Sequence, residues 1–229
     1  MALKDEIEAA VGKIFKEQWK YRDGQVVPEA EDVALGNEGV TLEATVLYAD
    51  LDGSTKMVDS YTPAFSAEIY KSFLYSTARV IRARGGEIVA YDGDRVMAVF
   101  IGDSKNTSAA KCALQINWTA KHLVMPLLKQ QYTDTTFDLK HIVGVDTSEL
   151  LVARTGVRGA NDLVWVGPAA NYAAKLTELS GFASWITHRV YDAMKDEAKL
   201  SNGREMWEKR TWTAMNGLAI YGSGWTWSL

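Results

Sequence analysis

Acidic residues stand where one β-rich run ends and where another begins, and both could bind a metal ion. The segment "VLYADLDGST" (46–55) is an apolar and aromatic run that ends at Asp50 and turns over Gly53. A second acid, Asp94, follows the Asp-Gly pair in "YDGDRVMAVF" (91–100). A carboxylate at the end of a core strand is costly unless it is paired or bound to a metal. Oxygen ligands of this kind suit Mg²⁺ or Mn²⁺, so the two acids are candidate metal ligands.

The turn "DGST" (52–55) is a candidate phosphate-binding loop. It offers successive backbone N–H groups ahead of a short predicted helix, and such groups attract anions. Mg²⁺ held by one or two carboxylates commonly completes its shell with water and phosphate oxygens. Taken singly, Asp50 could cap a helix and Asp94 could merely occupy a hairpin turn. Whether the two acids act together depends on the strand order.

The elements that must position these acids follow from apolar periodicity and turn residues. A helix begins after Thr62, its N-cap, with Pro63 at the first position, and a hairpin turns at Asp-Gly. The predicted elements are a strand at 41–50, a helix at 62–86, two strands within 86–102, a helix at 106–131 that Pro126 would kink, two strands within 137–157 and a short helix at 168–181. This β-α-β-β-α-β order predicts a ferredoxin-like α+β fold with a mostly antiparallel sheet. The first and third strands are neighbours in that fold, which would bring Asp50 and Asp94 together.

Composition excludes several classes of protein. The chain has 229 residues, of which 47% are hydrophobic and 24% charged, as in ordinary soluble globular proteins. A net charge of −4 argues against a nucleic-acid-binding surface. The single cysteine, Cys112, excludes an internal disulfide and suits a reducing compartment. No stretch approaches the roughly 18 apolar residues of a membrane span. We therefore expect a cytoplasmic protein without a membrane anchor.

The first 40 residues differ from the rest of the chain. An amphipathic helix at 4–20 and an irregular connector precede a predicted catalytic domain at 41–229. The apolar stripe of this helix needs a surface to cover it, so the helix could serve dimerisation or regulation.

Four segments, in chain order, resemble motifs of the class III nucleotidyl cyclases. "YADLDGST" (48–55) resembles the metal loop of that family, and "GGEIVAYDGDRVMAVF" (85–100) resembles its hairpin. "HIVGVDTSELLVARTGV" (141–157) and "VWVGPAANYAAKL" (164–176) resemble two later motifs. The resemblance covers residues 41–229, and it implies the cyclisation of a nucleoside triphosphate.

The resemblance implies metal and phosphate ligands. Asp50 and Asp94 match the two aspartates that bind two divalent cations, Mg²⁺ or Mn²⁺, with the Leu51 carbonyl as a further ligand. Four consecutive residues match the loop that binds the β- and γ-phosphates: Asp52, Gly53, Ser54 and Thr55.

The resemblance also implies a transition-state pair and a dimer. Asn171 and Lys175 match a pair that is usually Asn and Arg, and positions i and i+4 share one face of a helix. Lysine loses the bidentate phosphate contact of arginine, so either Lys175 acts alone or Arg158 takes over part of the role. In this family the two aspartates and the Asn/Arg pair come from different subunits. One chain that carries both sets implies a homodimer with composite sites.

The base-reading positions depart from the family pattern. Purine cyclases carry polar residues where this chain has Ile88 and Val164. A pocket that read a purine through hydrogen bonds would be expected to keep such groups. Tyr48, two residues before Asp50, could narrow the pocket, or it could be an ordinary core aromatic.

A chain of this size without purine-reading residues is similar to the pyrimidine cyclases of bacterial Pycsar anti-phage systems. That resemblance implies conversion of UTP to cyclic UMP as a second messenger, which a separate cyclic-nucleotide-binding effector protein detects. The alternatives are a cytidylate cyclase, an adenylate cyclase with a rebuilt base pocket, and a non-catalytic nucleotide-binding module on a cyclase fold.

Overall fold

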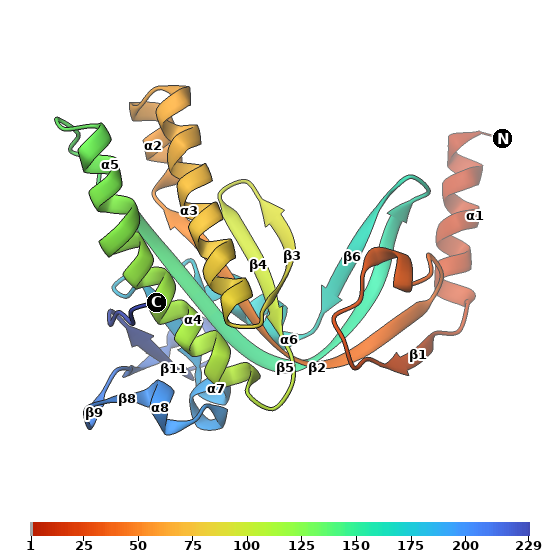
Figure 1. The fold of residues 1–229 in the computed structure, drawn as a ribbon. Coiled ribbons are helices and arrows are strands. Elements are labelled where there is room, and N and C mark those ends of the chain that lie inside the picture. Colours follow the sequence, from red (N-terminus) through yellow and green to blue (C-terminus); the bar gives the residue numbers. More distant parts are fainter. Residues whose placement is uncertain (1) are drawn as a thin grey trace. The chain divides into compact units, whose positions relative to one another are not determined.

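The computed structural model describes residues 2–229, which form two compact units (Figure 1). One unit comprises the chain through Glu43 together with Glu149–Gly167, and the other comprises Ala44–Ser148 and Pro168–Leu229. We call them the small unit and the large unit. The long strands β2 (Glu38–Asp52) and β5 (Lys140–Val157) contribute residues to both. The domain boundary after residue 40 stays a prediction.

The large unit contains the elements that the sequence predicts around the acids. Its helices are α2 (Ser54–Ser60), α3 (Pro63–Ala83), α4 (Lys105–Thr119), α5 (Met125–Gln131), α6 (Pro168–Leu176), α7 (His188–Ala193) and α8 (Asp196–Lys199). Its further strands are β3 (Glu87–Asp92), β4 (Arg95–Phe100), β7 (Ser184–Thr187), β8 (Leu200–Ser201), β9 (Arg204–Glu205), β10 (Glu208–Trp212) and β11 (Leu218–Ser223). Thr62 is the N-cap of α3, and its hydroxyl accepts a hydrogen bond from the Phe65 N–H at 3.3 Å, as the sequence predicts.

The strand order of the large unit is β10-β11-β7-β5-β2-β4-β3. β2 pairs antiparallel with β4, which itself pairs antiparallel with β3, while β5 and β7 are parallel. The segment β5-β2-β4-β3 is the order of a ferredoxin-like sheet, so that fold prediction is confirmed.

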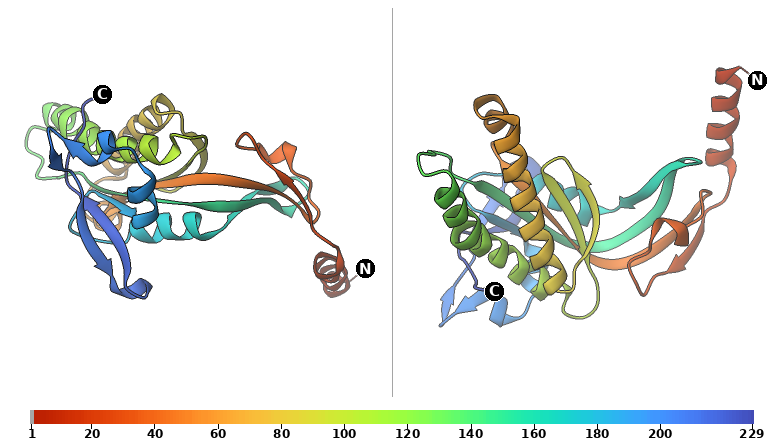
Figure 2. Two further views of the ribbon diagram at one scale, coloured as in Figure 1. Left: turned by 90° about the horizontal axis from the view of Figure 1, so that it is seen from below. Right: turned by 45° about the horizontal axis from the view of Figure 1, so that its top comes forward.

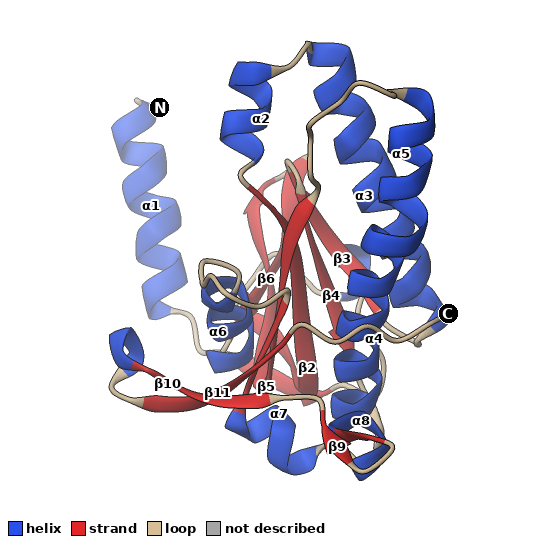
Figure 3. Cartoon of the chain, turned by 90° about the vertical axis from the view of Figure 1, so that its left-hand side faces the viewer, coloured by secondary structure: helices blue, strands red, loops and turns tan. Residues whose placement is uncertain are grey.

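The helices of the large unit cover both faces of its sheet. Figure 3 shows α3, α4 and α5 on one face, and the left view of Figure 2 shows α6 on the other. Residues along β5 alternate between the two faces of the sheet, because successive side chains of a strand point to opposite faces. Val143 and Val145 belong to the core beneath α3 and α4. Ile142 packs with Leu176 of α6 in a second, smaller core.

Residues 137–157 differ from the prediction of two strands. They contain a single strand, β5, which pairs in a hairpin with β6 (Ala160–Val166) of the small unit. The "DTS" tripeptide (146–148) has the composition of a turn. It stays extended because side-chain hydrogen bonds hold all three of its residues in the strand.

The N-terminal helix ends earlier than predicted. Helix α1 spans Leu3–Lys16 in the small unit, followed by the unpredicted strand β1 (Lys20–Asp23), parallel to β2, and the short helix η1 (Ala30–Asp32). The Asn37 amide donates to the carbonyls of Ile14 and Glu17 at 2.7 and 2.8 Å. These bonds satisfy carbonyls at the end of α1, which explains why the helix stops there.

The predicted helix at 106–131 is interrupted near Pro126. A π-helical segment (Ala120–Val124) separates α4 from α5. Proline lacks an N–H group and cannot continue the regular hydrogen-bond pattern, and π-bulges commonly accompany such breaks. None of the helices within residues 2–229 combines the length and the apolar character that a membrane span requires.

His141 on β5 makes the stability of the fold dependent on pH. Burial, together with the charge of Lys121, lowers its pKa to about 4. The unfolded chain binds a proton near pH 6.5 and the folded chain does not, so stability is lost as pH falls below 6.5. We expect His141 to cost about 2 kcal/mol of unfolding free energy between pH 7.5 and pH 5. Urea denaturation at both values should show a smaller loss in His141→Phe and an unchanged loss in the exposed-histidine control His122→Gln.

Candidate active site

The two predicted metal ligands come from adjacent strands of the large unit. Asp50 lies near the end of β2, where Ala49 pairs with Val96 of β4. Asp94 lies in the turn that joins β3 to β4, beside Gly93, whose φ of 61° requires a residue that tolerates the left-handed region. Because β2 and β4 run antiparallel, the end of β2 lies next to this turn.

Electrostatics links these two carboxylates. The pKa of Asp50 is raised to about 6, first by burial and then by the negative charge of Asp94, whereas Arg95 lowers it. The Oδ2 atom of Asp94 is buried and has no hydrogen-bond partner among the described residues. A buried carboxylate oxygen without a partner, next to a second carboxylate, is a good fit for a divalent cation.

Protein side chains alone do not complete a metal coordination shell here. Within residues 2–229 no group of three or more His, Cys, Asp or Glu side chains could hold a metal ion. Two carboxylates with several open positions suit Mg²⁺ or Mn²⁺ bound together with phosphate oxygens and water. The arrangement therefore fits a metal that binds with its substrate.

The predicted phosphate loop lies directly after Asp50. Gly53, with φ of 77°, is the N-cap of α2, in which Ser54 and Thr55 are the first residues, and Asp52 is exposed. A pocket of about 510 Å³ adjoins the loop. It is lined by Asp52, Gly53, Lys56, Met57, Ser60, Tyr61, Thr136, Phe137, Asp138 and Lys140. Its two lysines, Lys56 and Lys140, which the sequence motifs do not indicate, place positive charge beside the predicted phosphate loop.

Arg95 is a neighbour of Tyr48 that the sequence motifs do not indicate. The guanidinium carbon of Arg95 lies 5.6 Å from the centre of the Tyr48 ring, and Arg95 also pairs with Asp92 at 3.7 Å. Burial raises the pKa of the half-buried Tyr48. Tyr48 lies opposite Met97 in the β2–β4 register, so residues 95 and 97 share its face. Pairing the predicted strands at 41–50 and 95–100 residue by residue could have identified Arg95 as a neighbour of Tyr48.

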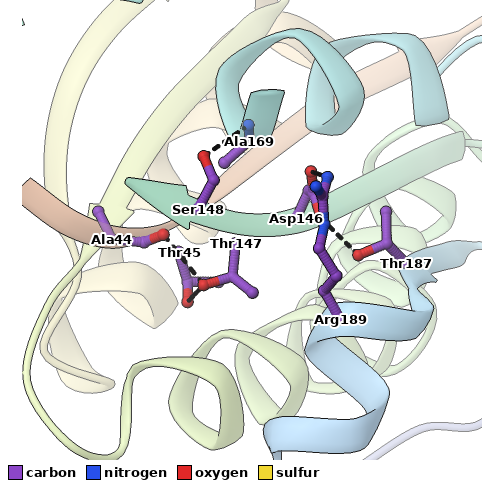
Figure 4. A network of polar contacts seen from close by, with 8 residues as sticks. All are labelled: Ala44, Thr45, Asp146, Thr147, Ser148, Ala169, Thr187 and Arg189. Carbon is purple, nitrogen blue, oxygen red and sulfur yellow. Dashed lines mark hydrogen bonds and ion pairs between the residues drawn. The ribbon is translucent and has the colours of Figure 1, made fainter. Parts of the chain in front are cut away.

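Asn171 and Lys175 are both exposed on α6, as positions i and i+4 of one helix should be. The Lys175 ammonium lies 3.9 Å from the sulfur of Met215. The hydroxyl of Ser148 accepts a hydrogen bond from the Ala169 N–H at 3.1 Å and so fixes the start of α6 (Figure 4).

The remaining predicted residues lie on other elements. Ile88, on β3, is half-buried against the main core of the large unit. Arg158 and Val164 belong to the small unit, in the exposed turn between β5 and β6 and on β6, respectively. Val164 is 39% exposed.

Comparisons with known proteins agree on the family. No family model matches the sequence. The chain is 53% identical to a uridylate cyclase of Xanthomonas perforans and 50% identical to one of Burkholderia cepacia, in each case over the full length of both proteins. A uridylate cyclase of Rhodovulum sp. is 39% identical, with 93% of this chain and 91% of that protein covered.

Solved structures agree on the fold. The adenylyl cyclase CyaB from P. aeruginosa superposes with a TM-score of 0.68 at 22% identity, over 81% of this chain and 95% of that one. A guanylyl cyclase superposes with a TM-score of 0.66 at 18% identity, over 82% and 95% of the two chains. The fold is therefore that of the class III cyclases, and the chain, an enzyme of the nucleotide cyclase type, belongs to the uridylate cyclase family.

Proposed function

We propose that the protein converts UTP to 3′,5′-cyclic UMP and diphosphate. The full-length identity of 50–53% to two uridylate cyclases carries the choice of UTP. The aliphatic side chains of Ile88 and Val164 are consistent with it, because neither can hydrogen-bond to a purine edge. Tyr48, held by Arg95, is placed on the same strand face as Asp50 and would narrow the space for the base.

In the proposed reaction the ribose 3′ oxygen loses its proton to solvent and attacks the α-phosphorus. The bond between the α-phosphorus and the oxygen that bridges it to the β-phosphate breaks, and diphosphate leaves. Asp50, Asp94 and the Leu51 carbonyl would hold two divalent cations, which when bound activate the hydroxyl and stabilise charge on the departing diphosphate. The backbone of residues 52–55, with Lys56 and Lys140 beside it, would bind the β- and γ-phosphates. Asn171 and Lys175 would stabilise charge on the transferring phosphate, with Arg158 as an additional candidate.

We propose a homodimer in which each site combines the aspartates of one protomer with α6 of its partner. The exposure of Asn171 and Lys175 supports this, because groups that act across an interface must be accessible in the single chain. The product would be a second messenger in bacterial anti-phage defence, detected by a separate cyclic-nucleotide-binding effector protein. The resemblance of the sequence motifs to the pyrimidine cyclases of such systems supports this role.

The test supplies ATP, GTP, CTP and UTP separately, with Mn²⁺ or Mg²⁺, and identifies the products by mass spectrometry. We expect cyclic UMP as the dominant product, lost in Asp50→Ala and kept in the exposed-acid control Asp59→Ala. Dominant cyclic CMP or cyclic AMP would replace UTP with another substrate. Absence of product from all four nucleotides would favour a non-catalytic nucleotide-binding module.

A further inference from the structure

Asp146 on β5 is a buried charge that the proposed reaction does not use. Its side chain is 0% exposed. Its Oδ1 accepts hydrogen bonds from the Thr187 hydroxyl at 2.5 Å and from Arg189 Nε at 3.2 Å, and its Oδ2 accepts from Arg189 Nη2 at 2.5 Å (Figure 4). A buried carboxylate with three donors is fully paired, and removing one partner of such a pair is strongly destabilising. The carboxylate therefore fixes the position of the Arg189 guanidinium.

Arg189 extends this link to α6. The carbon of its guanidinium lies 5.2 Å from the centre of the Tyr172 ring, within the range of a cation–π contact. Tyr172 is half-buried on α6, and its ring also meets Trp212 edge-on at 6.0 Å. It directly follows Asn171 in the chain, so an orientation imposed on the Tyr172 ring is imposed on the turn of helix that presents Asn171.

Ser148 holds the same helix at its start. Asp146 and Ser148 point to one face of β5, because side chains two residues apart share a face. The Ser148 hydroxyl bonds to the Ala169 N–H, while Thr147, between them, bonds to the Ala44 carbonyl at 3.1 Å from the opposite face. Helix α6 has nine residues, and helices this short depend on tertiary contacts for their stability. It is thus anchored to β5 at two points along its length.

We propose that Asp146 and Arg189 are positioning residues that orient α6, and with it Asn171, for catalysis. The buried carboxylate fixes the guanidinium, the guanidinium fixes the Tyr172 ring, and the ring fixes the helix. The proposal rests on the proposed function in one respect only, namely that Asn171 acts on the substrate. The mobility of α6 can be measured without any substrate.

The first test measures amide hydrogen exchange of the substrate-free protein. We expect faster exchange in the peptide that contains α6 in Arg189→Met and in Tyr172→Leu, and recovery towards wild type in Tyr172→Phe, which keeps the ring. The matched control is Arg210→Met, because Arg210 lies over the Phe182 ring at 5.6 Å but does not contact Asp146. Arg189→Met leaves the buried Asp146 carboxylate without its ion pair and should lower stability, so exchange is measured at a temperature where the variant is folded. Tyr172→Leu keeps that ion pair and tests the same link without this loss. Unchanged exchange of α6 in both Arg189→Met and Tyr172→Leu would overturn the proposal.

The second test measures kinetics with whichever nucleotide wild type converts. Displacement of a catalytic group commonly costs up to about a hundredfold, so we expect Arg189→Met to lower kcat by at least about tenfold with KM within twofold. In the Asn171→Ala background the same substitution should lower kcat clearly less than in wild type, because the part of its effect that acts through Asn171 is already lost. An equal loss in both backgrounds would overturn the proposal. If wild type converts none of the four nucleotides, the proposed function fails, whereas hydrogen exchange still decides whether Arg189 orients α6.

Discussion

Replacing Asp50 by Asn is expected to abolish cyclase activity without weakening the fold. The substitution removes one of the two carboxylates proposed to hold the metals, and loss of a metal ligand should lower kcat by about a thousandfold or more. The pKa of Asp50 is raised to about 6 by burial and by Asp94, which means that the folded chain disfavours the charge. Because Asp50 is partly exposed, solvent screens this effect, and we expect a gain in unfolding free energy of at most about 1 kcal/mol at pH 7.

Activity, Mn²⁺ binding and thermal unfolding of Asp50→Asn should be measured side by side. Asp94→Asn should behave alike, because the buried Oδ2 of Asp94 lacks a partner. The exposed acid Asp103 provides the control Asp103→Asn, which should match wild type in all three measurements. Loss of activity with unchanged Mn²⁺ binding would contradict a metal-binding role. A lower melting temperature would instead assign the carboxylate to the fold.

Local signals in the sequence were sufficient to predict the framework of the site. The Thr62 cap and the Asp-Gly turn mark a helix start and a hairpin, and so help to establish the β-α-β-β-α-β order. That order predicts that β2 and β4 are neighbours, and the register Ala49–Val96 confirms it. These features depend on residues close together in the chain, whose turn and helix preferences act independently of tertiary structure.

Contacts between distant residues could not be predicted in the same way. Asp146 and Arg189 are 43 residues apart, and no local pattern pairs a strand acid with a helix arginine. The same network explains why β5 is one strand where two were expected. A turn-like tripeptide stays extended because its side chains bond to β2, α6 and Thr187, and this tertiary context overrides the local preference.

Gly144→Ala is the substitution outside the metal site with the largest expected effect. A Cβ at residue 144 would lie 2.1 Å from the Ala173 carbonyl oxygen and 2.8 Å from the Leu176 Cβ, so α6 packs directly against the β5 backbone. The obstacle at 2.1 Å is backbone, which no rotamer change can relieve. We expect a loss of about 3 kcal/mol in unfolding free energy, the upper range for overpacking, from denaturant titration. We also expect kcat to fall by at least about tenfold as α6 shifts, because Asn171 and Lys175 lie on that helix.

Two comparisons separate the displacement of α6 from general destabilisation. Gly224→Ala places a methyl group in open space in the same unit, so its stability and kcat should match wild type. A cavity variant of the main core that lies away from α6, such as Ile69→Val, should cost about 1 kcal/mol and leave kcat unchanged at a temperature where the protein is folded. If Gly144→Ala keeps wild-type kcat while it is folded, the position of α6 does not limit the reaction. If it loses kcat under the same conditions, the close approach of α6 to β5 sets the geometry that the α6 side chains need.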